Sequence, residues 1–169
     1  YEERRAFLNQ VYSQFNNLVM AYQQLKENAP ARRVYAIGYP QIINPEGSCA
    51  ANVHLGKSEA EFAVQSIDYL DGVIAKAAAK AGVTYVDTQH AFDGHRLCDS
   101  GEKAVNGLTK GDDIAKFVAN ESYHPNAYGN ELLADLIARA TNNLSSPMPA
   151  SQNIANPIAS DSLPILKDV

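Results

Sequence analysis

The chain has 169 residues, of which 46% are hydrophobic and 20% are charged, so it can form one globular domain with a sizeable core. Its net charge of −5, without any clustered run of Lys or Arg, argues against a nucleic-acid or anionic-membrane surface, because both require a positive field. No apolar stretch approaches the roughly 20 residues that span a bilayer, and a small-molecule or ester substrate fits this composition better.

The N-terminal segment, residues 1–28, is predicted to be a single helix. Its apolar side chains recur at helical spacing, and they are Phe7, Val11, Phe15, Leu18, Tyr22 and Leu25. No capping residue precedes this stripe, and the chain begins at Tyr1 rather than at a methionine. We therefore expect a chain cut at or inside a helix, with the true N-terminus and a signal peptide upstream.

Two short runs of β-favouring residues flank a second predicted helix. Residues 34–37 and residues 83–86 each predict a buried strand. The spacing of Ser58 and Glu61 forms a capping box that predicts the start of the helix, and Gly82 predicts its end. A strand–helix–strand unit normally makes parallel strands, so the predicted class is α/β. Two strands cannot form the sheet alone, and we expect the others upstream.

The C-terminal third combines a long loop, a helix and a tail. Residues 87–122 contain few apolar side chains and are too long to be a mere connector, which indicates a functional loop region. A last helix is predicted after Pro125, with Asn126 as its N-cap and with Leu133, Leu136, Ile137, Ala140 and Leu144 on its apolar face. We therefore predict a domain over residues 1–145 and a dispensable linker or disordered tail over residues 146–169.

The two cysteines, Cys49 and Cys98, lie in segments rich in turn residues rather than in apolar runs. In a cytosolic protein, such residues would more often be independent buried thiols. Two loop cysteines instead indicate one disulfide and an exported protein, and metal binding is the weaker alternative.

His124 lies in a loop directly before the last predicted helix, within the sequence Glu-Ser-Tyr-His-Pro-Asn-Ala-Tyr-Gly at residues 121–129. A helix N-terminus disfavours the protonated ring, which suits a group that starts neutral and accepts a proton. Glu121, three residues earlier, is placed to accept a hydrogen bond from one ring nitrogen and fix the tautomer. On spacing alone, a loop histidine beside a proline is more often structural or solvated.

Residues 121–129 resemble the last conserved block of the GDSL/SGNH hydrolases, an acid-x-x-His-Pro pattern followed by Asn, a small residue and Gly. Further segments are similar, in the same order, to the secreted actinobacterial-type lipases and esterases of that family. These segments are residues 29–40, residues 82–87 and residues 92–98, the last of which contains the cysteine that such a loop joins in a disulfide. Four ordered matches are more specific than any single one, and together they cover roughly residues 1–144.

This resemblance implies a three-layer α/β/α, flavodoxin-like SGNH hydrolase fold, incomplete at the N-terminus, to which this chain contributes two strands and three helices. It also implies a secreted or cell-surface monomer that hydrolyses a small-molecule, lipid or acylated-sugar ester, with no metal or organic cofactor. His124 and Glu121 would be the catalytic residues in this chain. The family's nucleophilic serine and its oxyanion glycine and asparagine precede the first helix here, so the chain alone is expected to be inactive.

The chain departs from the family pattern before the histidine, where Glu121 replaces the usual Asp. The extra methylene changes the reach of the carboxylate, and some relatives use a backbone carbonyl at this point instead. Two serines imitate a nucleophile but lack its surroundings, because Ser162 lies in the predicted tail and Ser100 lies in a polar loop without a preceding strand.

Other interpretations compete with this one. His90 and His95 suggest a metal site, although their loop has no regular face and no third ligand at a recognisable interval. His95 is then expected to line the substrate entrance or to face water. Asp87 follows a predicted strand, where an Asp is at least as often a turn cap as a cleft residue. A non-catalytic SGNH-like module that binds glycans or lipids, or a zinc-dependent deacetylase with additional ligands, would account for the same fold.

Overall fold

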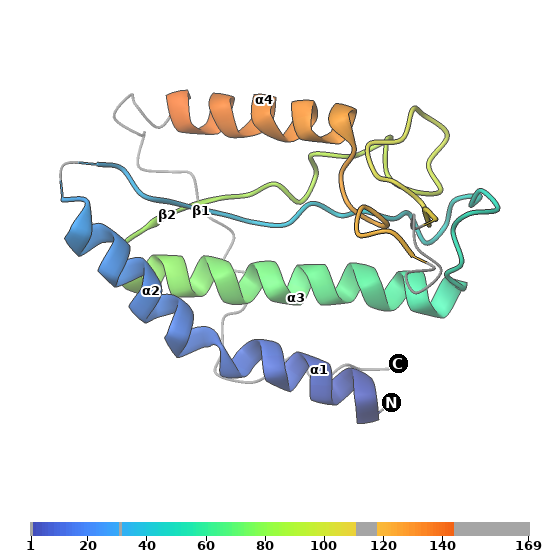
Figure 1. Ribbon diagram of the computed structural model, residues 1–169. Helices are drawn as coiled ribbons and strands as arrows, with labels where there is room; N and C mark the ends of the chain where they lie inside the picture. Colours follow the sequence, from blue (N-terminus) through green and yellow to red (C-terminus); the bar gives the residue numbers. More distant parts are fainter. Residues whose placement is uncertain (1, 31, 111–117, 144–169) are drawn as a thin grey trace.

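The computed structural model describes residues 2–30, 32–110 and 118–143 (Figure 1). In chain order, its elements are α1 (Glu2–Ser13), α2 (Phe15–Asn28), β1 (Tyr35–Ile37), α3 (Lys57–Ala81), β2 (Thr84–Val86) and α4 (Ala127–Asn143). The predicted tail over residues 146–169, with Ser162, lies outside the described residues. Among the helices of the described residues, none is both long and apolar enough to cross a bilayer.

The two strands form a parallel pair, as the strand–helix–strand pattern predicts, and α3 is the crossover between them. Tyr35 pairs with Thr84 and Ile37 with Val86, so each strand is one residue shorter than predicted. Figure 1 shows α4 on one side of the strands and α3 on the other, with α1 and α2 packed against α3. The core between the strands, α2 and α3 consists of Val19, Ala36, Ile74, Ala77, Ala78, Ala81 and Val83.

The N-terminal segment forms two helices rather than the single predicted one, which brings the number of helices in the described residues to four instead of three. The break lies at Gln14, whose N–H donates to the Val11 carbonyl, and the Ser13 hydroxyl donates back to the Gln10 carbonyl at 2.7 Å. Such a bond from Ser to an earlier carbonyl competes with the helical pattern and bends helices. Because of the bend, both halves of the segment contact α3.

The helix α3 begins slightly earlier than predicted. Gly56 is its N-cap, and the carboxylate of Glu59 accepts the Gly56 N–H at 2.7 Å. The predicted capping pair of Ser58 and Glu61 is therefore wrong, and the Ser58 hydroxyl instead accepts a hydrogen bond from Arg4 on α1 at 3.0 Å. The predicted end is confirmed, because Gly82 adopts the left-handed conformation with φ 68° that favours glycine at this position.

Asp71, in the middle of α3, is a buried carboxyl group beside the loop that follows β1. One of its oxygens accepts the Tyr39 N–H at 2.7 Å, and the other has no hydrogen-bond partner. Burial raises the pKa of Asp71 to about 6, against the opposing effect of the Tyr39 N–H and with a smaller contribution from Asp87. The folded protein therefore binds this proton more tightly than the unfolded chain does.

We expect Asp71→Asn to stabilise the protein at pH 8 relative to the wild type, but not at pH 4. The raised pKa gives the wild type a stabilising contribution that is complete below about pH 4 and is lost as the pH rises through about 6. With allowance for solvent screening, the free energy of unfolding of the variant, relative to that of the wild type, should rise by about 1 kcal/mol from pH 4 to pH 8. Urea unfolding at each pH measures it. Asp135→Asn, at an exposed site on α4, is the matched control, and an equal pH dependence in both variants would contradict the prediction.

Candidate active site

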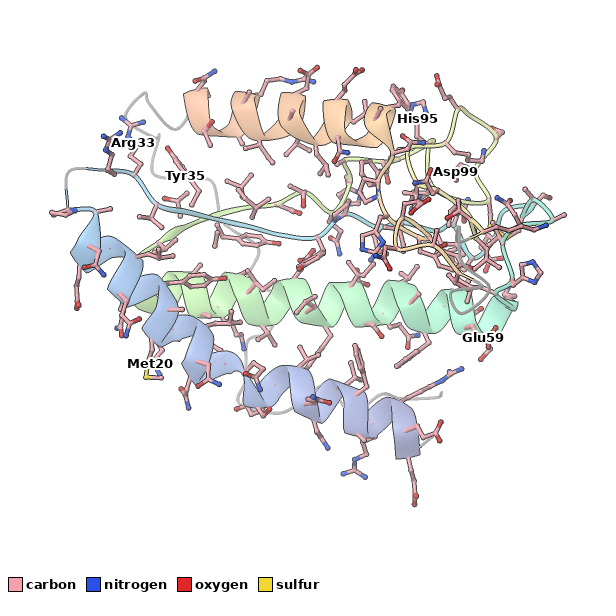
Figure 2. The ribbon with its side chains drawn as sticks, in the orientation of Figure 1. Met20, Arg33, Tyr35, Glu59, His95 and Asp99 are labelled. Atoms are coloured by element: carbon pink, nitrogen blue, oxygen red, sulfur yellow. A yellow bond between two sulfur atoms is a disulfide. The ribbon has the colours of Figure 1, made fainter. Side chains whose placement is uncertain are left out.

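The candidate site lies at the carboxyl ends of β1 and β2, where the loops that follow both strands meet (Figure 2). Ile43 and Leu97 form an isolated parallel bridge that continues the pairing of the two strands into these loops. A second core fills the space beneath them and consists of Ile43, Ala60, Phe92, Leu97, Cys98, Ala104 and Val105. Ligand sites in open α/β sheets occur at this end of the strands.

A disulfide joins Cys49 to Cys98, as the sequence predicts. It connects the loop after β1 to the loop after β2, and hydrogen bonds reinforce the same connection. The Asn44 N–H donates to the Leu97 carbonyl at 2.8 Å, and the Asn44 amide donates to the Asp99 carboxylate at 2.8 Å. The two loops therefore form one covalently closed unit beside His124.

The segment that carries His124 is paired with residues 104–106 in an antiparallel arrangement. The Asn106 N–H donates to the His124 carbonyl at 3.0 Å, and the Tyr123 N–H donates to the Asn106 carbonyl at 3.1 Å. Further along, the Asn126 N–H donates to the Ala104 carbonyl at 3.0 Å. Backbone bonds on both sides of His124 therefore fix the course of this segment.

The helix α4 starts immediately after this segment, with Asn126 as the predicted N-cap. The Asn126 side-chain oxygen accepts the Gly129 N–H at 2.9 Å, which satisfies a donor that the helix leaves free in its first turn. Gly129 lies so close to Ala104 that a β-carbon there would overlap the Ala104 carbonyl oxygen. Only glycine therefore allows the first turn of α4 to pack against residues 104–106 without a shift of the backbone.

The His124 ring is exposed, and a backbone carbonyl orients it. Its Nδ1 lies 2.9 Å from the Ser122 carbonyl oxygen. A carbonyl only accepts hydrogen bonds, so Nδ1 must carry a proton and donate it, and the Nε2 of the neutral ring is left as a proton acceptor. Tyr123 between these residues adopts a φ of 60°, which is unfavourable for a bulky residue and turns the chain sharply before His124.

The chain resembles lipases of Streptomyces in both sequence and structure. It is 33% identical to a lipase of Streptomyces rimosus over 127 residues, which cover 74% of this chain and 42% of the relative. It is 32% identical to lipase 1 of Streptomyces coelicolor over 110 residues, which cover 64% and 37%. A crystal structure of the extracellular S. rimosus lipase has a TM-score of 0.64 and 29% identity, and the match covers 80% of this chain and 53% of that one.

The chain is therefore similar to these Streptomyces lipases in both sequence and fold. A phospholipase A1 of Streptomyces albidoflavus is a further structural neighbour, with a TM-score of 0.65 and 28% identity over 78% of this chain and 55% of that one. The resemblance to the actinobacterial-type lipases of the GDSL/SGNH family is thereby confirmed. The chain spans about two fifths of the length of the curated relatives it matches. No protein-family model matches it.

Glu121, the other predicted catalytic residue, is exposed, and its backbone carbonyl rather than its carboxylate makes the hydrogen bonds in this turn. That carbonyl accepts the His124 N–H at 3.1 Å and the Asn106 side-chain amide at 3.2 Å. No hydrogen bond joins the Glu121 carboxylate to the His124 ring, whose Nδ1 is held by Ser122. The geometry therefore gives Glu121 a role in the turn, and its catalytic role stays a prediction.

The remaining polar candidates of the chain lie in turns. Asp87 accepts the Gln89 N–H at 2.9 Å, as expected of a turn cap. Asp99, beside Ser100, accepts two hydrogen bonds from Arg96; burial would raise its pKa, but these bonds and the one from Asn44 lower it. The Ser100 segment is therefore a structural turn, without the strand and helix of a nucleophile elbow.

The two loop histidines, His90 and His95, lie in different environments. His90 is exposed and forms an ion pair with Asp93 through Nδ1 at 3.0 Å when it is protonated. His95 contacts the Glu102 carbonyl and the Tyr128 hydroxyl, so it does not simply face water. Within the described part of the chain, no three His, Cys, Asp or Glu side chains come together as a group that could hold a metal. The sequence offered no indication of the contact between His95 and Tyr128, because 33 residues separate them.

Proposed function

We propose that the complete protein is a serine-type carboxylic ester hydrolase in which His124 is the general base. The observation that carries this proposal is the 2.9 Å contact between His124 Nδ1 and the Ser122 carbonyl, in an exposed ring at the carboxyl ends of the strands. It leaves Nε2 free to accept a proton, the state that a general base needs before the reaction. The named relatives, which are lipases and a phospholipase A1, support the same reaction class.

In this mechanism, a serine from outside the present sequence attacks the ester carbonyl while His124 Nε2 accepts the hydroxyl proton. The imidazolium returns that proton to the leaving alcohol, and a water molecule activated by the same nitrogen then hydrolyses the acyl-enzyme. The Ser122 carbonyl keeps the ring in one tautomer and one orientation and stabilises its charged form. The Glu121 carboxylate would act here only as a secondary group.

The three-layer flavodoxin-like arrangement is part of the same proposal. It is supported by helices on both sides of a parallel strand pair and by the likeness to the S. rimosus lipase. Export is supported by the disulfide, since such bonds persist in oxidising compartments, and by that neighbour's description as extracellular. We further propose that the protein acts as a monomer on a small-molecule, lipid or acylated-sugar ester, and that neither a metal nor an organic cofactor takes part.

The proposal is tested with the full-length product of the gene. We expect it to react covalently with a serine-directed fluorophosphonate and to hydrolyse nitrophenyl esters, and a series of increasing acyl-chain length will define its preference. The present chain, assayed in parallel, should show neither reaction, since the proposal places the nucleophile outside it. A complete protein that binds lipid or glycan without labelling or turnover would contradict the proposal and indicate a non-catalytic module.

A further inference from the structure

The side chain of His95 connects the two segments that surround His124. Figure 2 shows it beside the first turn of α4, although it belongs to the loop after β2. Its Nδ1 lies 2.9 Å from the Glu102 carbonyl, and its Nε2 lies 3.3 Å from the Tyr128 hydroxyl. The rings of His95 and Tyr128 also meet edge to face, with their centroids 5.2 Å apart and an angle of 82° between their planes.

These contacts fix the roles of the two His95 nitrogens. The Glu102 carbonyl can only accept, so Nδ1 carries the proton and donates it. In the neutral ring, Nε2 is then an acceptor, and the Tyr128 hydroxyl donates to it. The ring thus binds an acceptor on one segment and a donor on the other, a combination that neither a lysine nor an aliphatic residue offers.

The two segments that His95 connects also hold the general base. Glu102 directly precedes residues 103–106, whose backbone pairs with residues 123–126 on both sides of His124. Tyr128 lies two residues beyond Asn126, in the first turn of α4. The Lys103 carbonyl also accepts the Asn126 side-chain amide at 2.7 Å. His95 therefore adds a side-chain connection at the end of this backbone pairing, where the chain continues from His124 into α4.

We propose that His95 is a positioning residue, which fixes the segment carrying His124 by connecting the Glu102 carbonyl to the Tyr128 hydroxyl. The inference rests on the proposed function of His124 as general base. The hydrogen bonds of the His95 ring go to Glu102 and Tyr128 rather than to His124, so it acts through the first turn of α4. Loss of the connection allows the His124 ring to leave its productive position, and a displacement of about 1 Å can lower a rate constant about 100-fold.

Amide hydrogen exchange and steady-state kinetics of the complete protein test the proposal on His95→Ala, Tyr128→Phe and the double variant. Tyr128→Phe keeps the aromatic ring and removes only the hydroxyl, so it stays informative if His95→Ala folds poorly. His90→Ala is the matched control, because it removes an exposed histidine from the same loop. Active-site titration with a fluorophosphonate corrects kcat for the fraction of folded enzyme.

We expect faster exchange of the amides at residues 104–106 and 123–126 in His95→Ala and Tyr128→Phe, with a kcat about 10- to 100-fold lower in His95→Ala and an unchanged KM. The double variant should match His95→Ala, because both changes break the same contact. His90→Ala should behave as the wild type.

Amide exchange and kcat equal to those of the wild type in both His95→Ala and Tyr128→Phe would overturn the inference. A raised KM without faster exchange would also overturn it, because that result indicates that His95 contacts the substrate. His124→Ala, measured in the same series, separates the two proposals. Full activity of that variant would refute the role of His124, whereas faster exchange in the His95 variants depends only on the structural connection.

Discussion

Replacing His124 by alanine in the complete protein should reduce kcat by several orders of magnitude, on the order of 10⁴-fold or more. The reason is chemical rather than structural. The ring is exposed and hydrogen-bonds to the Ser122 carbonyl rather than packing in the core, so its removal leaves the core intact. Steady-state hydrolysis of a nitrophenyl ester measures the loss, and circular dichroism and thermal unfolding should show an unchanged fold.

Glu121→Ala is the matched control for this experiment, because it removes an exposed side chain from the same turn. Its backbone carbonyl, which accepts the His124 N–H, is retained in the variant. We expect a much smaller loss of kcat, since the Ser122 carbonyl still holds Nδ1. Equal losses in both variants would show that the carboxylate orients the ring in the complete enzyme. Equal activity of wild type and His124→Ala would refute the catalytic assignment.

Removal of the disulfide should have the largest effect on stability. The bond between Cys49 and Cys98 closes a loop with a sequence separation of 49 residues. In the chain-entropy model, such a closure limits the unfolded chain enough to contribute about 4 kcal/mol to the free energy of unfolding. We expect the Cys49→Ser, Cys98→Ser double variant to lose about this amount in urea unfolding, with the largest increase in amide exchange in the loops after β1 and β2.

The control for the disulfide is the wild type unfolded with and without a reducing agent. Reduction should lower the midpoint of the wild type to that of the double variant and leave the double variant unchanged. A midpoint of the double variant equal to that of the oxidised wild type would mean that the hydrogen bonds between Asn44, Leu97 and Asp99 are sufficient to hold the loops together.

Short sequence patterns predicted correctly those elements that a few adjacent residues determine. The strands, the end of α3 at Gly82 and the start of α4 at Asn126 each depend on a few adjacent residues, and the structure places them within a residue or two of the expected positions. The break at Gln14 was not predicted, because the apolar stripe continues through it and only the packing of both halves on α3 distinguishes two helices from one.

The candidate site was predictable only in part for the same reason. The motif identified His124, and the positions of Cys49 and Cys98 in loops indicated their pairing. Periodicity carries no information about which carbonyl faces a ring nitrogen, and spacing alone favours the carboxylate three residues away. The left-handed conformation of Tyr123 instead accompanies a turn in which the carbonyl of Ser122 faces the ring. Which carbonyl faces the ring depends on the backbone conformation, and the residue types at these positions do not indicate it.

Residues of one short motif are under two different kinds of selection, as the close approach of Gly129 to Ala104 indicates. Under the proposed role of His124, selection retains the exposed ring only while hydrolysis is useful, whereas Gly129 and the capping Asn126 support the packing of α4 in either case. A descendant that has lost its activity would be free to change the histidine and would still keep the glycine and the asparagine. Among relatives of this chain, a substitution at position 124 with Asn126 and Gly129 unchanged would therefore indicate a domain that folds but no longer turns over its substrate.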